Sequence, residues 1–291
     1  MFSVLRPDRA IRAALAFTLA GLLMAGLGAA ARARPAADEP GFQRVSIPLI
    51  AEGKPDARDS AVAGYLFMPE GNGRFPAVVL IHGCNGYDWQ VRGQPGWTLA
   101  KAYARRYVAH GYAALVLDSF EPRGLYNICG QPMRVGARRR AWDALSAARW
   151  LGTLGTIDRD RLVLQGDSHG GWTVLVTLQA GLWHLPEHFA AGIAFYPYCY
   201  DVGGISAPLL ILIGDADDWA PAWRCRQMVA ALHRAGKDGA VELKIFPGAY
   251  HAYDFPLPAR TNALGHFMRY DAAATAASWQ AIDAFLAAHL R

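Results

Sequence analysis

The sequence has few charged residues, which make up 18% of its 291 positions. Soluble domains usually contain about 25%, and disordered chains are typically more charged and less apolar than this one. The formal net charge is +5, but no basic stripe follows a predicted element. The only cluster, Arg138 to Arg140, is interpreted as a solvent-exposed helix face. We therefore expect no nucleic-acid partner.

An uncharged run rich in Ala and Leu lies near the N-terminus. There, the net-positive segment "MFSVLRPDRAIR" precedes "AALAFTLAGLLMAGLGAAA", and both Ala29-Ala30-Ala31 and Ala31-Arg32-Ala33 fit a small-x-small cleavage site. This order is typical of a secretory signal peptide. We predict a signal peptide over residues 1–33, a linker over 34–41 and one folded domain over 42–291. The mature protein is expected to be periplasmic or extracellular, without stable membrane association. An uncleaved membrane anchor is the alternative.

Cysteine is also scarce, with Cys84, Cys129, Cys199 and Cys225 as the four residues of this type. None belongs to a C-x-x-C pair or accompanies a histidine cluster, so the sequence indicates no metal site. An even number of cysteines in an exported chain favours disulfides, and four cysteines allow three pairings. Four free, buried thiols are the alternative.

What the sequence does contain is a regular alternation of strand-like and helix-like segments. Apolar runs predict strands over 42–50, 61–68, 75–83, 112–120, 161–166, 189–197, 207–215 and 241–248. Helical spacing predicts helices over 97–110, 137–154, 169–181, 222–235 and 270–289. Continuous apolar strands between helices indicate an α/β fold with a mostly parallel sheet covered on both faces. Such sheets bind ligands at the carboxyl ends of their strands.

The segment Gly166-Asp167-Ser168-His169-Gly170 stands at one such end, between a predicted strand and a predicted helix. G-x-S-x-G in this context is typical of a nucleophile elbow, a sharp turn that exposes the serine hydroxyl. Side chains at the flanking glycines would collide with the turn. The alternative is a tight structural turn without chemistry.

A serine hydroxyl needs a base, and the base needs an orienting acid. Asp215 ends the predicted strand 207–215, and Asp217 and Asp218 follow it. His251 follows the last predicted strand. All lie at or just past a strand's carboxyl end and in the chain order serine, acid, histidine. His266 lies in a later loop and stays open as a second candidate base.

Acyl transfer also requires hydrogen-bond donors for a developing oxyanion. The backbone N–H of His169, directly after the serine, is one candidate. The loop "LIHGCNG" offers the N–H of Cys84 as the second. A plain strand-ending turn is the alternative for this loop. A disulfide from Cys84 to Cys129 on the next loop would hold that donor in place.

Three segments, "GDSHGG", "GDADDWAP" and "PGAYHAY", resemble the dienelactone hydrolase family within the α/β-hydrolases. The resemblance runs from about Ala61 to the C-terminus and implies an α/β-hydrolase catalytic domain. It places the nucleophile at Ser168 and the base at His251. It places the acid at Asp217, with Gly214 and Pro221 in register. Dienelactone hydrolases proper use a cysteine nucleophile, so the serine leaves ester or lactone cleavage as the expectation and casts doubt on dienelactone itself.

We therefore expect a serine hydrolase that cleaves carboxylic esters or lactones of small molecules through an acyl-enzyme, without metal or organic cofactor. A serine peptidase of the same fold and a non-catalytic exported binding protein are the alternatives. Aromatic residues adjoin the active-site loops, and we interpret most as packing and some as the lining of an acyl or aryl pocket. They are Tyr87, Trp89, Trp172, Tyr196, Tyr198, Trp219, Trp223, Tyr250 and Tyr253.

Overall fold

The computed structural model describes residues 41–50, 60–87, 95–237 and 240–290. The predicted signal peptide lies outside these residues, as do most of the predicted linker and Trp89. Among the helices of the described ranges, none is long and apolar enough to cross a membrane.

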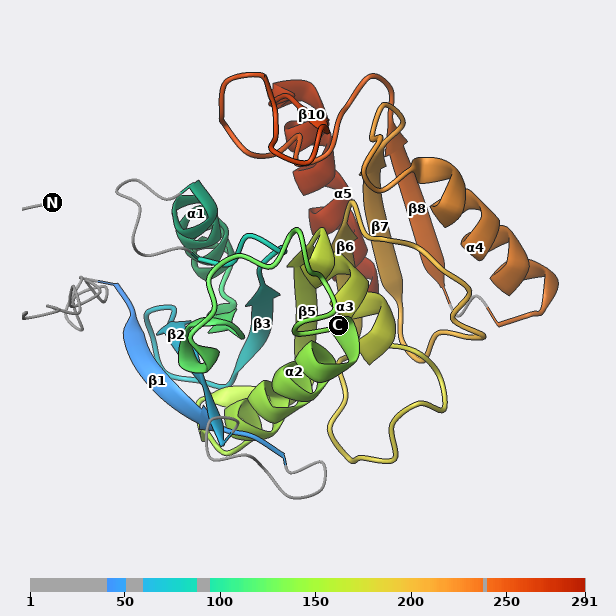
Figure 1. The fold of residues 1–291 in the computed structure, drawn as a ribbon. Helices are drawn as coiled ribbons and strands as arrows, with labels where there is room; N and C mark the ends of the chain where they lie inside the picture. The colour runs from blue at the N-terminus through green and yellow to red at the C-terminus, as the bar shows by residue number, and fades with distance from the viewer. Residues whose placement is uncertain (1–40, 51–59, 88–94, 238–239, 291) are drawn as a thin grey trace, which may run out of the picture. The chain divides into compact units, whose positions relative to one another are not determined.

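Eight strands form one sheet, in the order β1-β2-β4-β3-β5-β6-β7-β8 (Figure 1). Their bounds are β1 Gln43–Pro48, β2 Ala61–Phe67, β3 Phe75–Ile81, β4 Ala113–Asp118, β5 Ile157–Asp167, β6 Ala191–Phe195, β7 Leu209–Gly214 and β8 Val241–Phe246. β1 and β2 pair antiparallel, and β2 runs antiparallel to β4. From β4 to β8 every pair is parallel. The predicted α/β class with a mostly parallel sheet is confirmed.

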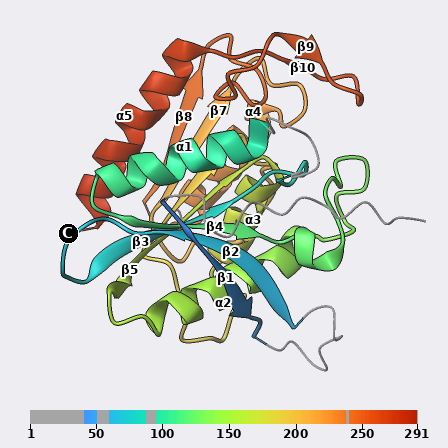
Figure 2. The ribbon, with the colours of Figure 1, turned by 90° about the vertical axis from the view of Figure 1, so that its left-hand side faces the viewer.

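The helices pack against both faces of this sheet. They are α1 Pro95–Ala109, α2 Ala137–Gly152, α3 His169–Thr177, α4 Ala222–Arg234 and α5 Ala272–His289, with the short 3-10 helix η2 at Glu121–Arg123. α1 and α5 lie side by side on one face, where Arg106 pairs with Asp283 at 2.7 Å (Figure 2). α2 and α3 lie on the other face, in front of β5 in Figure 1.

The central strands explain the continuous apolar runs of the sequence. Every residue of β4, β6 and β7 is buried, because helices cover both faces and no side of these strands meets water. Apolar and polar residues would alternate along a strand only if one face of the sheet were exposed to water.

Several details differ from the predictions. α3 ends at Thr177 rather than at residue 181. β5 begins at Ile157 rather than residue 161, since buried Ile157 pairs with Phe75 although the residues between are polar. The structure also contains an unpredicted short hairpin of β9, Arg260–Thr261, and β10, Phe267–Met268. Two residues per strand are too few to show a period. A bridge from Met268 to His251 brings this hairpin to the segment after β8.

Candidate active site

The predicted site residues come from loops at one edge of the sheet. Ser168 follows β5, Asp217 lies three residues beyond β7, and His251 lies in the loop after β8. β5, β6, β7 and β8 are consecutive parallel strands of the sheet, so their carboxyl ends lie at the same edge. This is the edge at which open α/β sheets bind ligands.

The elbow has the strained geometry that its sequence predicts. Ser168 adopts φ 52° and ψ −113°, a positive-φ conformation that non-glycine residues rarely take. A Cβ atom on Gly166 would lie 2.4 Å from the carbonyl carbon and oxygen of Gly170, and one on Gly170 would lie 2.2 Å from the carbonyl oxygen of Ile81. The Ser168 N–H donates to the Phe195 carbonyl at 2.9 Å. The two glycines therefore permit a turn that places the serine at the sheet edge.

The three side chains are joined by hydrogen bonds. Nε2 of His251 lies 2.9 Å from Oγ of Ser168, and Nδ1 lies 2.8 Å from Oδ2 of Asp217. His251 and Asp217 are 3% and 4% exposed, so water competes little for these bonds. The other oxygen of Asp217 accepts the N–H groups of Trp219 and Ala220 at 2.9 and 2.8 Å. The carboxylate is thus fixed with one oxygen facing the imidazole, which leaves Nε2 free to accept the serine proton.

The other candidates have different partners. Asp215 accepts the N–H of Gly248 at 2.7 Å, and Asp218 lies 3.2 Å from Nδ1 of His266. The His266 ring stacks on Trp219, with centroids 4.8 Å apart and planes at 10°. The His266 ring therefore makes its polar contact with Asp218, and Ser168 is hydrogen-bonded to His251 instead.

Two disulfides join the cysteines, Cys84 with Cys129 and Cys199 with Cys225. The alternative of four free thiols is therefore wrong. Cys84 is also held by its carbonyl, which accepts the Ile128 N–H at 2.8 Å. Within the part of the chain that the structure describes, neither the Cys84 N–H nor the His169 N–H donates to another protein atom. Both are available to a bound oxyanion.

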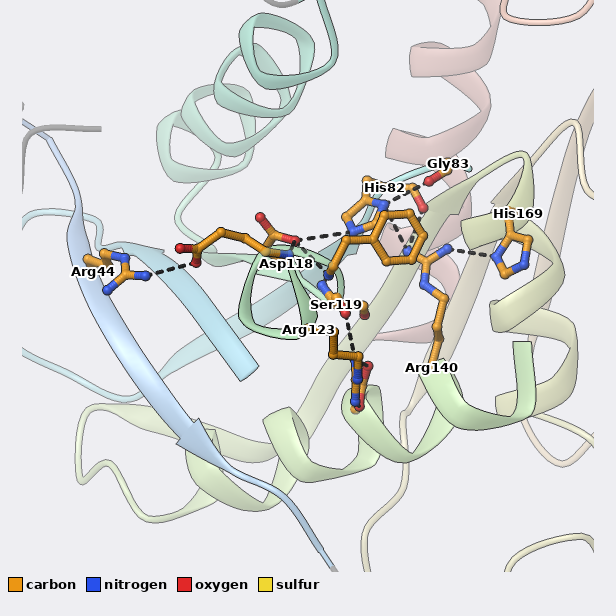
Figure 3. Close-up of polar contacts among 11 residues, drawn as sticks. Arg44, His82, Gly83, Asp118, Ser119, Arg123, Arg140 and His169 are labelled. Carbon is orange, nitrogen blue, oxygen red and sulfur yellow. Dashed lines mark hydrogen bonds and ion pairs between the residues drawn. The ribbon is translucent and has the colours of Figure 1, made fainter. Parts of the chain in front are cut away.

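The interpretation of Arg138 to Arg140 as one exposed face is wrong for Arg140, whose exposure is 0%. Its Nη2 donates to the His82 carbonyl at 2.6 Å, and its Nη1 lies 2.8 Å from Nδ1 of His169 (Figure 3). The helical period was the overlooked signal, since Arg140 lies on the same α2 stripe as buried Ala137, Ala141 and Ala144.

The contacts of His169 fix its protonation. Nε2 lies 2.9 Å from the Pro132 carbonyl, which only accepts, and Nδ1 faces a guanidinium, which only donates. The ring is therefore neutral, with its hydrogen on Nε2. Burial and the charge of Arg140 lower the pKa of His169 to about 3. The His169 side chain contacts Arg140 and Pro132, so its backbone N–H is the group of this residue that could bind an oxyanion.

His82 connects Arg140 to the other predicted oxyanion donor. Nδ1 of its buried ring lies 2.7 Å from the Gly83 carbonyl, and its Nε2 accepts the Ser119 N–H at 3.3 Å. Nη2 of Arg140 also lies 3.1 Å from this Nδ1, but a carbonyl oxygen can only accept, so the 2.7 Å contact with Gly83 places the hydrogen on Nδ1. Because the Gly83 carbonyl and the Cys84 N–H belong to one planar peptide group, this bond also fixes the direction of the Cys84 N–H.

A second buried network, missed in the sequence, supports His251. Both oxygens of Asp254 accept tyrosine hydroxyls, from Tyr196 at 2.6 Å and from Tyr103. The Tyr196 ring meets His251 edge to face, with centroids 4.7 Å apart. Burial and the charge of Asp254 raise the pKa of Asp167 to about 7. The one sequence signal was the position of Asp254, three residues after His251.

Residues 62–290 match the family model described as dienelactone hydrolase family. The chain belongs to the dienelactone hydrolase family. Membership confirms the resemblance stated from the three motifs and the α/β-hydrolase fold. It also makes the chain an enzyme of the carboxylic ester hydrolase class.

One relative is similar to this chain over less than half of the chain's length. The quorum-quenching protein AidA of Acinetobacter baumannii is 32% identical over 123 residues, which are 42% of this chain and 37% of that protein. The chain thus matches little more than a third of that relative's length.

Two solved structures share the fold over most of the chain. A thermophilic esterase of Thermogutta terrifontis has a TM-score of 0.60 at 20% identity, covering 85% of this chain and 92% of its own. A dienelactone hydrolase-like promiscuous phosphotriesterase from metagenomic libraries has a TM-score of 0.61 at 19% identity, covering 84% and 98%.

Proposed function

We propose that this enzyme hydrolyses carboxylic esters or lactones through an acyl-enzyme formed on Ser168, with His251 as base and Asp217 as orienting acid. The observation that carries the proposal is the pair of hydrogen bonds from His251, at 2.9 Å to the serine and 2.8 Å to the aspartate. The geometry matches the roles of a nucleophile, a general base and an orienting carboxylate.

In the acylation step, Oγ of Ser168 bonds to the carbonyl carbon while Nε2 of His251 takes its proton. The carbonyl oxygen becomes an oxyanion, which the N–H groups of Cys84 and His169 stabilise. The tetrahedral intermediate collapses, the bond to the alcohol oxygen breaks, and that oxygen receives the proton from His251. The Nδ1–H of His251 remains bonded to Asp217 throughout.

In the deacylation step, His251 removes a proton from water as the water oxygen attacks the acyl carbon. The second tetrahedral intermediate expels Oγ of Ser168, which takes the proton back from His251. The products are a carboxylic acid and the free enzyme. A lactone follows the same steps, with both products remaining on one molecule.

The solved structures with this fold support such chemistry. The Thermogutta esterase was solved with propionate bound and also phosphorylated by paraoxon, the latter at 21% identity and a TM-score of 0.61 to this chain. A phosphorylated esterase and a bound carboxylate are the states expected of a nucleophilic ester hydrolase.

We also propose export, with residues 1–33 removed as a signal peptide. Support comes from the two disulfides, which form and persist in oxidising compartments. Mass measurement of the protein isolated from the periplasm or medium tests this proposal. A mature N-terminus after Ala33 is the expected result, and an intact residue 1 would contradict it.

The test of the catalytic proposal is Ser168→Ala, assayed with p-nitrophenyl butyrate and a fluorophosphonate probe. Turnover should fall by about 10⁴-fold or more, and labelling should disappear while the melting temperature stays close to that of wild type. A wild-type protein that reacts with neither reagent would favour a binding protein. Cleavage of peptide amides faster than esters would favour a peptidase.

A further inference from the structure

Ser168 lies where two cavities of different character meet. One, of about 640 Å³, has a mixed lining in which Asn85, Asn127 and Arg260 stand among apolar residues. The other, of about 350 Å³, is lined by Trp172, Tyr198, Trp219 and further apolar groups. Ser168 and His251 line both. Each volume is in the range of small-molecule sites, so the two parts of an ester would enter different surroundings.

The smaller cavity presents aromatic rings directly beside the nucleophile. The ring of Trp172 meets that of Tyr198 edge to face, with centroids 6.0 Å apart at 65°. Trp219 lies against the His251 ring at 4.9 Å. Aromatic pairs prefer such offset and edge-to-face arrangements, so a further ring entering this cavity finds both edges and faces to contact.

The aromatic lining continues outward from the cavity. The Arg224 guanidinium lies 5.2 Å from the centroid of the Tyr198 ring and 4.7 Å from that of Trp223. Tyr198 is 43% exposed and Trp223 is 53% exposed. Together, Trp172, Tyr198, Arg224 and Trp223 form what we name the aromatic ladder, which begins in the catalytic cavity and ends at the surface.

The second disulfide holds this ladder in place. It joins Cys199, directly after Tyr198, to Cys225, directly after Arg224. Both cysteines are buried, at 1% and 0% exposure. The loop after β6 and the first turn of α4 are therefore covalently fixed to each other. A preorganised surface loses less conformational entropy when a ligand binds, which is the property expected of a binding site.

We propose that the aromatic ladder is a substrate subsite, and that the enzyme selects esters whose aromatic part has two or more rings in line. This inference rests on the proposed function, because the ladder starts at Ser168. The first ring would occupy the cavity of Trp172 and Tyr198, and the next would reach Arg224 and Trp223. Guanidinium and aromatic faces both favour aromatic groups over alkyl groups of equal size.

The experiment compares one-ring with two-ring esters on both sides of the scissile bond. Methyl benzoate and methyl 4-phenylbenzoate vary the acyl part, whereas phenyl acetate and 4-phenylphenyl acetate vary the alcohol. Wild-type kcat/KM should favour the two-ring ester in at least one pair, and that pair identifies the side that the ladder binds. Trp223→Ala and Tyr198→Leu should each lower this preference by about three- to tenfold.

The control variant is Tyr112→Ala, which removes a half-buried ring just before β4, at the opposite end of the sheet. Its two-ring preference should equal that of wild type. Melting temperatures of all variants show whether a change reflects unfolding. If a Trp223→Ala protein is unstable, Trp223→Leu keeps a large apolar side chain and loses only the ring.

The following outcomes separate a failure of the proposed function from a failure of the proposed subsite. If wild type turns over neither the four esters nor p-nitrophenyl butyrate, the proposed function fails, whereas activity on p-nitrophenyl butyrate alone leaves that function standing and overturns the subsite. If wild type is active but both ladder variants keep its two-ring preference, the subsite is overturned. If 4-cyclohexylphenyl acetate responds to the variants as strongly as 4-phenylphenyl acetate, the site selects size rather than aromatic rings, which also overturns the proposal.

Discussion

Nη1 of Arg140 lies 2.8 Å from Nδ1 of His169, the residue directly after the elbow serine. The other guanidinium nitrogen, Nη2, donates to the carbonyl of His82 at 2.6 Å. One buried cation on α2 thus connects the two segments that carry the proposed oxyanion donors. Removing it would leave each segment to be held by its remaining contacts alone.

We expect Arg140→Met to lower kcat by about tenfold with little change in KM, because misdirected N–H groups stabilise the transition state less. Arg140→Lys should behave similarly, since an ammonium group lacks the planar fork that reaches both partners. Steady-state kinetics with p-nitrophenyl butyrate provide the measurement. Arg138→Met, on the exposed side of α2, is the matched control. A rise of KM with unchanged kcat in Arg140→Met would contradict a role in positioning the donors.

Neighbouring aspartates allow a sharp test of the orienting acid. Asp217→Asn should lower kcat by about 10⁴-fold, because an amide would favour the wrong tautomer of His251. Asp218→Asn removes the exposed partner of His266 and should leave kcat within about twofold of wild type. A loss in Asp218→Asn as large as that in Asp217→Asn would contradict the assignment.

The disulfide between Cys84 and Cys129 closes a separation of 45 residues. Loop-entropy arguments assign such a bond about 4 kcal/mol of stability. The double change Cys84→Ala with Cys129→Ala should therefore lower the melting temperature. It should also lower kcat, since the Cys84 N–H loses a covalent restraint. In Cys199→Ala with Cys225→Ala, stability should fall with a smaller loss of kcat on a one-ring ester. Equal kcat losses in both double variants would argue against a specific effect on the donor.

Asp167 predicts a pH dependence of stability. Its pKa is raised to about 7 in the folded protein by burial and by Asp254, whereas an unfolded aspartate titrates near 3.9. The folded state therefore holds the proton more tightly, and this contribution to stability is present below about pH 4 and lost as the pH rises through 7.

In urea unfolding, Asp167→Asn should flatten this slope and be more stable than wild type at pH 8 by about 2 kcal/mol, allowing for the partial exposure of the side chain. The same substitution at Asp160, a largely exposed residue on the same strand, is the control. An unchanged slope in Asp167→Asn would show that other groups set the pH dependence.

The sequence was sufficient to predict the local parts of this molecule. Apolar runs located all eight strands of the main sheet, and the glycines around Ser168 predicted the turn in which φ is 52°. These features depend on neighbours within a few residues, where sterics and periodicity act directly. The chain order of serine, acid and histidine also limited the candidates to loops at one sheet edge.

The family resemblance already favoured Asp217 over Asp218 as the acid, but only the tertiary structure shows their different contacts, Asp217 with His251 and Asp218 with His266. It also decided the disulfide pairing and the partners of Arg140, whose burial the helical period indicates but whose contacts with His82 and His169 it does not. The aromatic ladder likewise joins segments that the sheet and the Cys199–Cys225 bond bring together. Contacts of this kind depend on chain closure over tens of residues, and periodicity holds no information about them.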